Sequence, residues 1–400
     1  MKNDIPDNIQ QIARLCQQHN GEAWVVGGTV RDIFLNKPSK DWDLEIHNLD
    51  GNSLYNILRS IGPCKRVGKS FSVFKLNNNN MEIDVALPLD NGQDNPNLGI
   101  KEALRRRDLT INAMAYNLHT HTLYDPFNGQ QDIQQKMLRA TDPQTFVEDP
   151  LRVLRVAQFA SRFSFQIADE LRNICLQLEL SSVPKERILI EMHKMWLRSP
   201  KPSVGLQRMK ELELFSILPN WEKPTHPAVL LAVDRCQATT FADTAHQLAA
   251  FWICALHKTN TQYQQPILNT LKLHSINKIN LQHLILAVLS ALEYGTKMCT
   301  DIEIRRLSDI APLSFLWRVF SCIYSPEGHP HIGRLKDRIQ QLNLWNNTLP
   351  QLLKGKELMR MGYIGKDIGL TLKHIREQQI LGVIETKEEA LTLLQERKKQ

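Results

Sequence analysis

The chain has 400 residues, with 49 Lys or Arg against 42 Asp or Glu, and its formal net charge is +7. This length exceeds a single hydrophobic core and predicts two to four domains, and the positive balance is compatible with an acidic partner such as RNA. The chain has no run of 18 apolar residues, and its first residues do not form a charged-then-apolar leader. We therefore expect a cytoplasmic protein with no membrane span.

The seven cysteines are odd in number and form no C-x-x-C pair. This pattern predicts reduced, mostly packed thiols of a cytosolic protein and favours neither a disulfide framework nor a zinc site.

The first ninety residues alternate between helical and strand patterns. Residues 5–19 predict an amphipathic helix that buries Ile9, Ile12, Ala13 and Cys16. The elements expected next are a strand at 23–27, a helix at 29–36, a strand at 42–47, a helix at 52–61 and strands at 64–76 and 81–87. The four asparagines 77–80 predict a turn that joins the last two strands in an antiparallel hairpin.

A glycine turn and two aspartates form the most informative segment. The run Gly27-Gly28-Thr29-Val30-Arg31-Asp32 follows an apolar strand, and Asp41-Trp42-Asp43 begins nine residues after it. Free N–H groups at a turn and helix start attract phosphate oxygens, and Arg31 adds a charged fork. Because strand side chains alternate between faces, Asp41 and Asp43 point the same way, and their repulsion makes Mg²⁺ a natural partner. Each half alone is commonly an ordinary turn or a solvated strand face. Together they favour nucleotidyl transfer by two metal ions.

Three further segments bear on this site. Asp84, on the predicted strand 81–87, is a candidate to support the metals, although a solvated strand-end aspartate would look the same. Residues 88–104 are rich in Asp, Asn, Gly and Pro and predict a mobile loop. The cluster Arg105-Arg106-Arg107-Asp108 follows, and arginine forks suit triphosphate oxygens because they bind bidentately and stay charged. A surface basic cluster with Asp108 as a helix cap is the alternative.

The run Glu148-Asp149-Pro150-Leu151-Arg152-Val153-Leu154-Arg155 predicts a helix start, with Asp149 as cap and Pro150 in the first turn. Arg152 and Arg155 share a face of this helix. An ordinary capped amphipathic helix would show the same pattern. Chemically, however, a carboxylate beside a guanidinium accepts cytosine and adenine, which present an amino donor beside a ring-nitrogen acceptor, and rejects guanine and uracil, which present the opposite pair at those positions.

These motifs, in this order, resemble the class II tRNA nucleotidyltransferase and poly(A) polymerase family of the polymerase-β superfamily. The resemblance covers residues 20–200 and, more weakly, the glycine-punctuated C-terminal segments 355–365 and 384–390. It implies that Asp41 and Asp43 are catalytic metal ligands and that Asp84 supports them. Within the nucleotide site, it implies that Asp149 and Arg152 read the base and that Glu148 orients them. The full set of residues that it implies bind the nucleotide is Gly27, Gly28, Arg31, Arg107, Asp108, Glu148, Asp149, Arg152 and Arg155.

Helical spacing takes over from about residue 141. Arg187, Glu191 and Lys194 fit an exposed helical face that either meets RNA or is simply solvated. Some relatives append a metal phosphohydrolase domain built on a His-Asp pair. Here Lys258 follows His257 where that pair needs Asp, and His246 is expected to be structural, so we predict no such activity.

The expected fold is an α/β nucleotidyltransferase head with a mixed sheet, followed by an all-helical neck, body and tail. We expect the head at 1–140, the neck with the selecting motif at 141–200, the body at 201–330 and a tRNA-binding tail at 331–400. The resemblance implies template-independent addition of C and A to tRNA 3′ ends from CTP and ATP, with Mg²⁺. Three alternatives remain open: addition of CC only, given the short segment 88–105; poly(A) polymerase; and a non-catalytic RNA-binding relative. No protein partner is inferable.

Overall fold

The computed structural model describes residues 5–37, 41–67, 73–78, 81–90, 92–273, 275–345 and 347–399. They divide into two compact units. The first comprises Met1–Met195 with Gln207–Ile217, and the second comprises Trp196–Leu206 with Leu218–Gln400.

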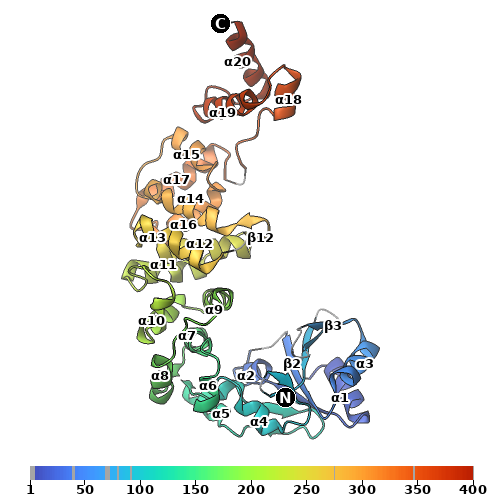
Figure 1. Ribbon diagram of the computed structural model, residues 1–400. Coiled ribbons are helices and arrows are strands. Elements are labelled where there is room, and N and C mark those ends of the chain that lie inside the picture. Colours follow the sequence, from blue (N-terminus) through green and yellow to red (C-terminus); the bar gives the residue numbers. More distant parts are fainter. Residues whose placement is uncertain are drawn as a thin grey trace. The chain divides into compact units, whose positions relative to one another are not determined.

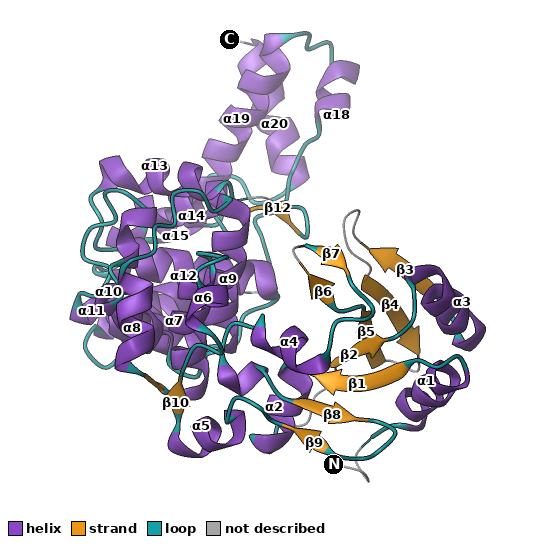
Figure 2. Cartoon of the chain, turned by 60° about the horizontal axis from the view of Figure 1, so that its bottom comes forward, coloured by secondary structure: helices purple, strands orange, loops and turns teal. Residues whose placement is uncertain are grey.

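The first unit contains a seven-stranded mixed sheet in the order β3-β4-β5-β2-β1-β8-β9 (Figures 1 and 2). β2 and β5 run parallel, and the other neighbours in this sheet are antiparallel. This arrangement confirms the predicted mixed-sheet head. Its strands are β1 (Glu22–Val26), β2 (Asp41–His47), β3 (Cys64–Val67), β4 (Val73–Asn78), β5 (Met81–Ala86), β8 (Ala115–Asn117) and β9 (Leu123–Tyr124).

The two faces of this sheet have different coverings. Helix α1 (Asp7–Gln18) packs on β1 and on α3 (Gly51–Ile61), and it buries the four residues predicted for its inner face. On the other face, Trp24 and Val26 of β1 form an apolar cluster with Leu104 of α4 (Ile100–Arg105). Trp24 lies directly opposite Glu45 of β2, so the alternate side chains Asp41, Asp43 and Glu45 belong to this second face.

Two sequence predictions in this unit are wrong. Residues 64–76 are not one strand, because β3 and β4 pair antiparallel with Cys64 opposite Leu76. Residues 88–104 are not an irregular loop, because they form the short hairpin β6 (Leu89–Asp90) and β7 (Gln93–Asp94) and then α4. The predicted hairpin of β4 and β5 is confirmed by the pairing of Asn78 with Met81, whereas positions 79 and 80 of its expected turn lie outside the described residues.

The rest of the first unit is mainly helical, apart from a short parallel pair formed by β10 (Met137–Leu138) and β11 (Gln166–Ile167). Its helices are α2 (Gly28–Phe34), η2 (Thr110–Asn112), α5 (Gly129–Gln135), α6 (Pro143–Phe146), α7 (Arg152–Phe163), α8 (Asp169–Leu176), most of α9 (Lys185–Arg198), the end of α10 (Pro202–Glu211) and η3 (Leu214–Ile217).

The second unit is helical except for the small hairpin β12 (Ser275–Ile276) and β13 (Ile279–Asn280). Its helices include α11 (Pro227–Ala238), α12 (Thr244–Leu256), α13 (Thr261–Leu271), α14 (Leu281–Ser290), η4 (Leu292–Gly295), α15 (Asp301–Leu307), α16 (Leu313–Tyr324) and α17 (Pro330–Gln341). Three more helices follow near the C-terminus: α18 (Gly355–Arg360), α19 (Lys366–Ile380) and α20 (Lys387–Lys399).

Helix α12 has ten buried residues and runs through the core of this unit, in contact with α11, α14 and α16. Among the helices that the structure describes, none is long and apolar enough to cross a membrane.

Candidate functional site

Three carboxylates gather on one face of β2 and β5. Asp43 is the direct cross-strand neighbour of Asp84, and Asp41 lies two residues before Asp43 on the same face. Burial raises the pKa of Asp43, and the nearby charges of Asp84 and Asp41 raise it further, whereas Arg107 and Arg31 act in the opposite direction. Asp84 Oδ2 accepts a hydrogen bond from Lys75 Nζ at 3.0 Å. The cluster concentrates negative charge at one edge of the apolar core.

This donor set fits a hard divalent cation. Carboxylate oxygens are the ligands that such cations prefer, and a cation beside Asp43 removes the repulsion that raises its pKa. Thr29 on α2 positions the end of β2 that carries the pair, because its Oγ1 donates to the Asp41 carbonyl and accepts from the Asp43 N–H.

The glycine turn closes over these carboxylates. Gly27 has φ 63° and ψ −126°, a conformation that L side chains rarely adopt, and it caps the N-terminus of α2. A Cβ atom at Gly27 would lie 2.6 Å from Arg107 Nη1 and 3.9 Å from Asp43 Oδ2. At Gly28 a Cβ would lie 3.6 Å from the same Asp43 oxygen. A side chain at Gly27 would therefore displace the Arg107 guanidinium, whereas a Cβ at Gly28 would make ordinary contacts.

Arg31 is buried behind the turn. Its Nη1 donates to Asn112 Oδ1 at 2.5 Å and its Nε to Asp32 Oδ1 at 2.8 Å. The guanidinium carbon lies 4.8 Å from the ring centroid of Phe163 on α7. With 4% of its surface exposed, Arg31 ties the glycine turn to the segments around it.

Arg107 is held by a residue that the sequence analysis did not single out. Its Nη2 donates to Glu45 Oε2 at 3.0 Å. Burial opposes ionisation of Glu45, but the hydrogen bond from His47 and the charge of Arg107 together lower the pKa of Glu45. The sequence does carry a signal for this role, because Glu45 continues the alternation of Asp41 and Asp43 along the same strand face.

Asp108 and Arg155 form a second, more buried network. Arg155 Nε donates to Asp108 Oδ2 at 2.7 Å, and the Asn112 side-chain amide and the Leu109 N–H donate to Asp108 Oδ1. These interactions lower the pKa of Asp108 although burial alone would raise it. Arg155 Nη1 also lies 3.7 Å from Glu191 Oε1. The network joins the arginine motif of the head to α7 and α9.

The prediction that Glu191 is exposed is wrong. It was expected on an exposed helical face with Arg187 and Lys194, but only 4% of its surface is exposed. Lys194 Nζ donates to it at 2.8 Å, so Glu191 has two cationic neighbours, Lys194 and Arg155.

Asp149 and Arg152 lie near one another in sequence, but each has its own protein partners. Helix α7 begins at Arg152, two residues later than an Asp149 cap predicts, although Asp149 Oδ1 still accepts from the Leu151 N–H at 3.2 Å. Asp149 Oδ2 accepts from Arg187 Nη2 at 2.7 Å. Arg152 donates to the carbonyls of Thr145 at 2.5 Å and Arg106 at 2.7 Å.

The environment of these two residues differs. Burial lowers the pKa of Arg152 although the charge of Asp108 acts in the opposite direction. Asp149 and Arg187 are about one-third and one-half exposed. Glu148 Oε2 lies 3.7 Å from Arg106 Nη1. The structure thus places Asp41, Asp43, Asp84, Gly27, Gly28 and Arg107 around one point, and links Asp108, Arg155 and Arg152 to it through the arginine motif.

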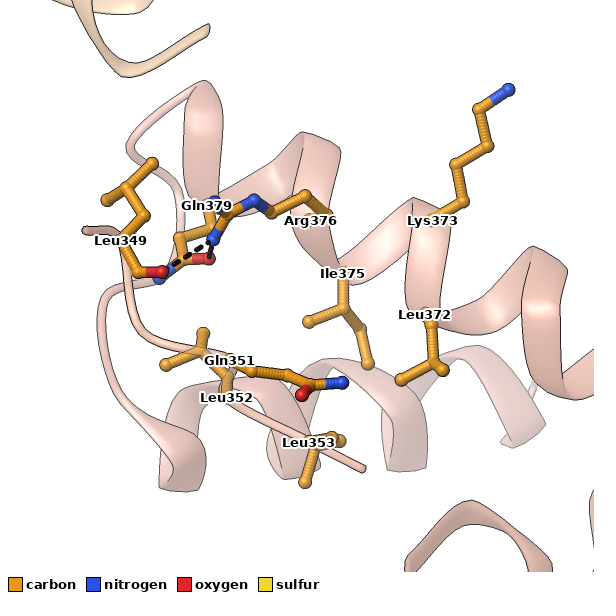
Figure 3. A pocket seen from close by; sticks show the side chains of 9 residues that line it. All are labelled: Leu349, Gln351, Leu352, Leu353, Leu372, Lys373, Ile375, Arg376 and Gln379. Carbon is orange, nitrogen blue, oxygen red and sulfur yellow. Dashed lines mark hydrogen bonds between the residues drawn. The ribbon is translucent and has the colours of Figure 1, made fainter. Parts of the chain in front are cut away.

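A pocket of about 350 Å³ lies elsewhere, in the second unit (Figure 3). The segment containing Leu349 and Leu352 forms one wall, and Leu372, Lys373 and Arg376 of α19 form the other. Arg376 Nη1 donates to the Leu349 carbonyl and to Gln379 Oε1. The pocket contains none of the site residues predicted from the sequence.

The amino-acid sequence matches known families over its N-terminal half. Residues 23–139 match the family model described as Poly A polymerase head domain, and residues 164–223 match a model described as probable RNA and SrmB- binding site of polymerase A. The chain is 41% identical over 211 residues to the CCA-adding enzyme of Blochmanniella floridana, a match that covers 49% of each chain. It is 36% identical over 213 residues to the multifunctional CCA protein of Vibrio vulnificus, covering 49% of this chain and 50% of that one.

The chain thus spans about half the length of the curated relatives it matches. Its fold is similar over a longer range. The Bacillus stearothermophilus CCA-adding enzyme in complex with CTP superposes with a TM-score of 0.76 at 22% identity, over 98% of both chains. The Thermotoga maritima CCA-adding enzyme complexed with tRNA gives a TM-score of 0.62 at 21% identity, over 98% of this chain and 95% of that one. By these matches, residues 23–139 are similar to the Poly A polymerase head domain, the N-terminal half is similar in sequence to CCA-adding enzymes, and the fold as a whole is that of CCA-adding enzymes.

Proposed function

We propose that this chain is a tRNA nucleotidyltransferase that adds C and A to tRNA 3′ ends without a nucleic-acid template. The observation that carries the proposal is the cross-strand pair of Asp43 and Asp84 beneath the Gly27 turn, with Arg107 at the same point. The choice of substrates is supported by the chain's similarity to CCA-adding enzymes, whose solved structures include complexes with CTP, ATP and tRNA. Such substrates imply a cytoplasmic protein.

In the proposed reaction the 3′-hydroxyl oxygen of tRNA bonds to the α-phosphorus of CTP or ATP. The bond from that phosphorus to the pyrophosphate leaving group breaks, and the hydroxyl loses its proton. Asp41 and Asp43 would hold Mg²⁺, with Asp84 in support. When bound, the metal would make the hydroxyl more acidic and neutralise charge on the triphosphate.

Side chains of the protein itself would bind the triphosphate and hold the site in shape. Arg107, held in place by Glu45, would donate to triphosphate oxygens above the Gly27 and Gly28 turn. Arg31 would act from behind the turn by fixing its shape, since its own donors already reach Asn112 and Asp32. The neighbouring network of Asp108 and Arg155 would set the position of the arginine motif against α7.

Base selection is proposed for Asp149 and Arg152. Cytosine and adenine both offer an amino donor and a ring-nitrogen acceptor, which a carboxylate and a guanidinium complement. Both side chains keep capacity for a base, because a carboxylate has about four acceptor sites and a guanidinium five donors. Their present partners, Arg187 on one side and the carbonyls of Thr145 and Arg106 on the other, would fix their directions. Glu148 would support this arrangement from its position beside Arg106.

We also retain the proposed division into a head at 1–140, a neck at 141–200, a body at 201–330 and a tRNA-binding tail at 331–400. The solvent-facing lysines and arginines of α18 and α19 support a role for the tail in binding an acidic partner.

Product length tests the function. The purified chain is incubated with tRNA that lacks its terminal CCA, together with Mg²⁺ and CTP, ATP or both. Addition of two residues with CTP alone and of three with both nucleotides is the expected result. A product that stops after CC when both are present would assign the chain to CC-adding enzymes, and a growing run of A would assign it to poly(A) polymerases. Absence of any nucleotide incorporation would leave only the non-catalytic alternative.

A further inference from the structure

Three buried cysteines from three helices of the second unit meet at one point. Cys236 is on α11, Cys254 on α12 and Cys322 on α16, and all three are buried. Their Sγ atoms all lie within 4.8 Å of one another. Among the described residues, these cysteines are the group in which three metal-ligand side chains lie this close together. The spacing of the cysteines in the sequence gave no sign of it, because 18 and 68 residues separate successive members.

Such a trio has the dimensions of a metal site. Sulfur ligands bind zinc at about 2.3 Å, which places them roughly 4 Å apart around the ion. Small side-chain shifts would bring the three Sγ atoms to that spacing. We propose that Cys236, Cys254 and Cys322 bind one thiophilic d¹⁰ metal ion, for which Zn²⁺ is the common biological candidate. The ion would tie α11, α12 and α16 together inside the helical core.

The electrostatics favour a divalent ion. Three thiolates with a divalent cation carry a net charge of −1, whereas a monovalent cation would leave −2 in a low-dielectric core. One positive group lies close by, because Arg235 Nη1 donates to the Cys322 carbonyl at 3.4 Å. The Thr239 hydroxyl oxygen lies 3.5 Å from Cys322 Sγ and makes the environment of that sulfur partly polar.

The three thiols differ in pKa. Hydrogen bonds from Cys236 and Cys254 lower the pKa of Cys322 to about 4, whereas burial raises the pKa of Cys236 and of Cys254. Metal binding would form three metal–sulfur bonds in place of S–H bonds and release those protons to solvent, so the affinity should fall as the pH falls.

The test is metal binding by the full chain under reducing conditions. The chain is incubated with Cd²⁺, a spectroscopic probe for Zn²⁺ sites, until the sulfur-to-metal charge-transfer absorption stops growing, because the site is buried and entry is expected to be slow. The same chain, expressed in zinc-supplemented medium, is analysed for zinc. We expect one Cd²⁺ per chain, a raised Tm with bound metal, and an affinity at least about 100-fold lower in Cys254→Ala.

Matched controls come from the other buried cysteines. Cys16→Ala and Cys175→Ala remove thiols that lie in the first unit, and both should keep the full charge-transfer signal. Circular dichroism of Cys254→Ala separates loss of the ligand from loss of the fold, and Cys236→Ser serves as a second ligand variant. If the wild-type chain shows neither the absorption band nor zinc after expression, or if the control variants lose the signal as much as Cys254→Ala does, the trio is only packed core and the proposal is overturned.

Discussion

At the scale of single residues, Asp43 is half-buried and has two neighbouring carboxylates, and desolvation together with their charges raises its pKa. A carboxyl group whose pKa is higher in the folded chain than in the unfolded one adds stability at low pH. That contribution is lost as the pH rises through the folded-state pKa. Near neutral pH, and without a cation, the ionised Asp43 therefore destabilises the fold. This is the cost expected of a group placed for chemistry and not for packing.

Replacing Asp43 with Asn should separate function from stability. Asp43→Asn should abolish nucleotide incorporation and, in metal-free buffer at neutral pH, raise the free energy of unfolding by about 1 kcal/mol. The gain should shrink as the pH falls, since wild-type Asp43 then becomes neutral as well. Thermal unfolding followed over a pH series with a chelator measures this. Asp41→Asn, at an exposed position, is the matched control, and it should lose activity without the gain in stability.

Gly27 supports a second prediction, about backbone geometry. Gly27→Ala places a side chain at φ 63° and drives its Cβ to 2.6 Å from Arg107 Nη1. The expected result is a loss of roughly 1–3 kcal/mol in stability together with weaker binding of nucleotide triphosphates. Denaturant unfolding and nucleotide titration measure the two effects. Gly333→Ala in α17 has open space and an ordinary φ, and it should stabilise the chain by about 0.5–1 kcal/mol.

Asp149 and Arg187 support a prediction about selectivity. Asp149→Ala should weaken discrimination against UTP and GTP by about 1–3 kcal/mol, because the acceptor for the base amino group is lost. Arg187→Gln should shift selectivity in the same direction by a smaller amount, since it removes the 2.7 Å contact that orients the carboxylate. The ratio of kcat/KM for the four nucleotides is the measurement. Arg172→Gln, which removes an exposed pair on α8, is the control. Equal slowing of all four nucleotides would show that Asp149 acts only on the local backbone.

Residue patterns predicted part of this site well. The shared face of Asp41 and Asp43 follows from strand alternation alone, and the need for glycine at 27 follows from the turn. The partners of these residues were not predictable in the same way. Arg187 follows Asp149 by 38 positions, and Glu45 precedes Arg107 by 62, so the pairs depend on how helices and strands pack. A local pattern contains no information about that packing.

At the scale of elements, the hairpin β6–β7 contacts the arginine motif. Arg106 Nη2 donates to Asp90 Oδ1 of β6 at 2.5 Å, and the carbonyl of the same Arg106 accepts from Arg152 Nη2 at 2.7 Å. The hairpin is therefore connected through one residue to the arginine proposed to read the base. The segment expected to be a mobile loop thus contains a strand pair that is joined to the selecting motif.

This connection predicts the effect of Asp90→Ala. Without its ion pair to the hairpin, Arg106 has less to hold its backbone in register with Arg152, so the proposed base-reading residues should fit the larger adenine less well than cytosine. We expect addition of C to remain within a few-fold of wild type while addition of the terminal A falls by about tenfold, equivalent to 1.4 kcal/mol. Gel analysis of products ending in C, CC and CCA gives both rates. Glu102→Ala, which removes the partner of neighbouring Arg105, should leave the two rates in their original ratio.

The errors in element prediction have physical causes. Residues 64–76 contain a turn signal, Gly68-Lys69-Ser70, but the strand-forming residues on both sides of it led to the prediction of one strand, whereas β3 and β4 pair antiparallel. The polar, glycine-containing composition of 88–104 is typical of loops, but cross-strand pairing and the Arg106 contact stabilise a hairpin there. Burial of Glu191 arises from contacts with α7, which helical spacing on α9 alone does not encode.

At the scale of the whole molecule, the cationic side chains of the C-terminal region are of two kinds, those in ion pairs and those that face solvent. Arg306 and Arg376 are engaged in ion pairs with Glu377 and Asp309, and these pairs tie α19 to the region of α15. Lys356 on α18 and Lys373 on α19 are instead solvent-facing, and no ion pair is recorded for either among the described residues. Cations of the second kind are the ones available to neutralise phosphates of an RNA partner.

The double variant Lys356→Gln/Lys373→Gln should therefore weaken tRNA binding through electrostatics alone. Each phosphate contact releases condensed counterions, and a plot of log affinity against log salt has a slope of about −0.9 per contact for a duplex and −0.7 for a single strand. Losing both contacts should flatten the slope by about 1.5 and leave the fold, measured by thermal unfolding, unchanged. Binding of tRNA measured from low to moderate salt gives the slope directly. The exposed cations Lys210 and Lys258, which lie outside the C-terminal helices, provide the control pair for the same substitution. If the slope of the tail variant equals that of the wild type while the control pair flattens it, tRNA contacts the body and not the tail, and the proposed division of labour between these parts of the chain is wrong.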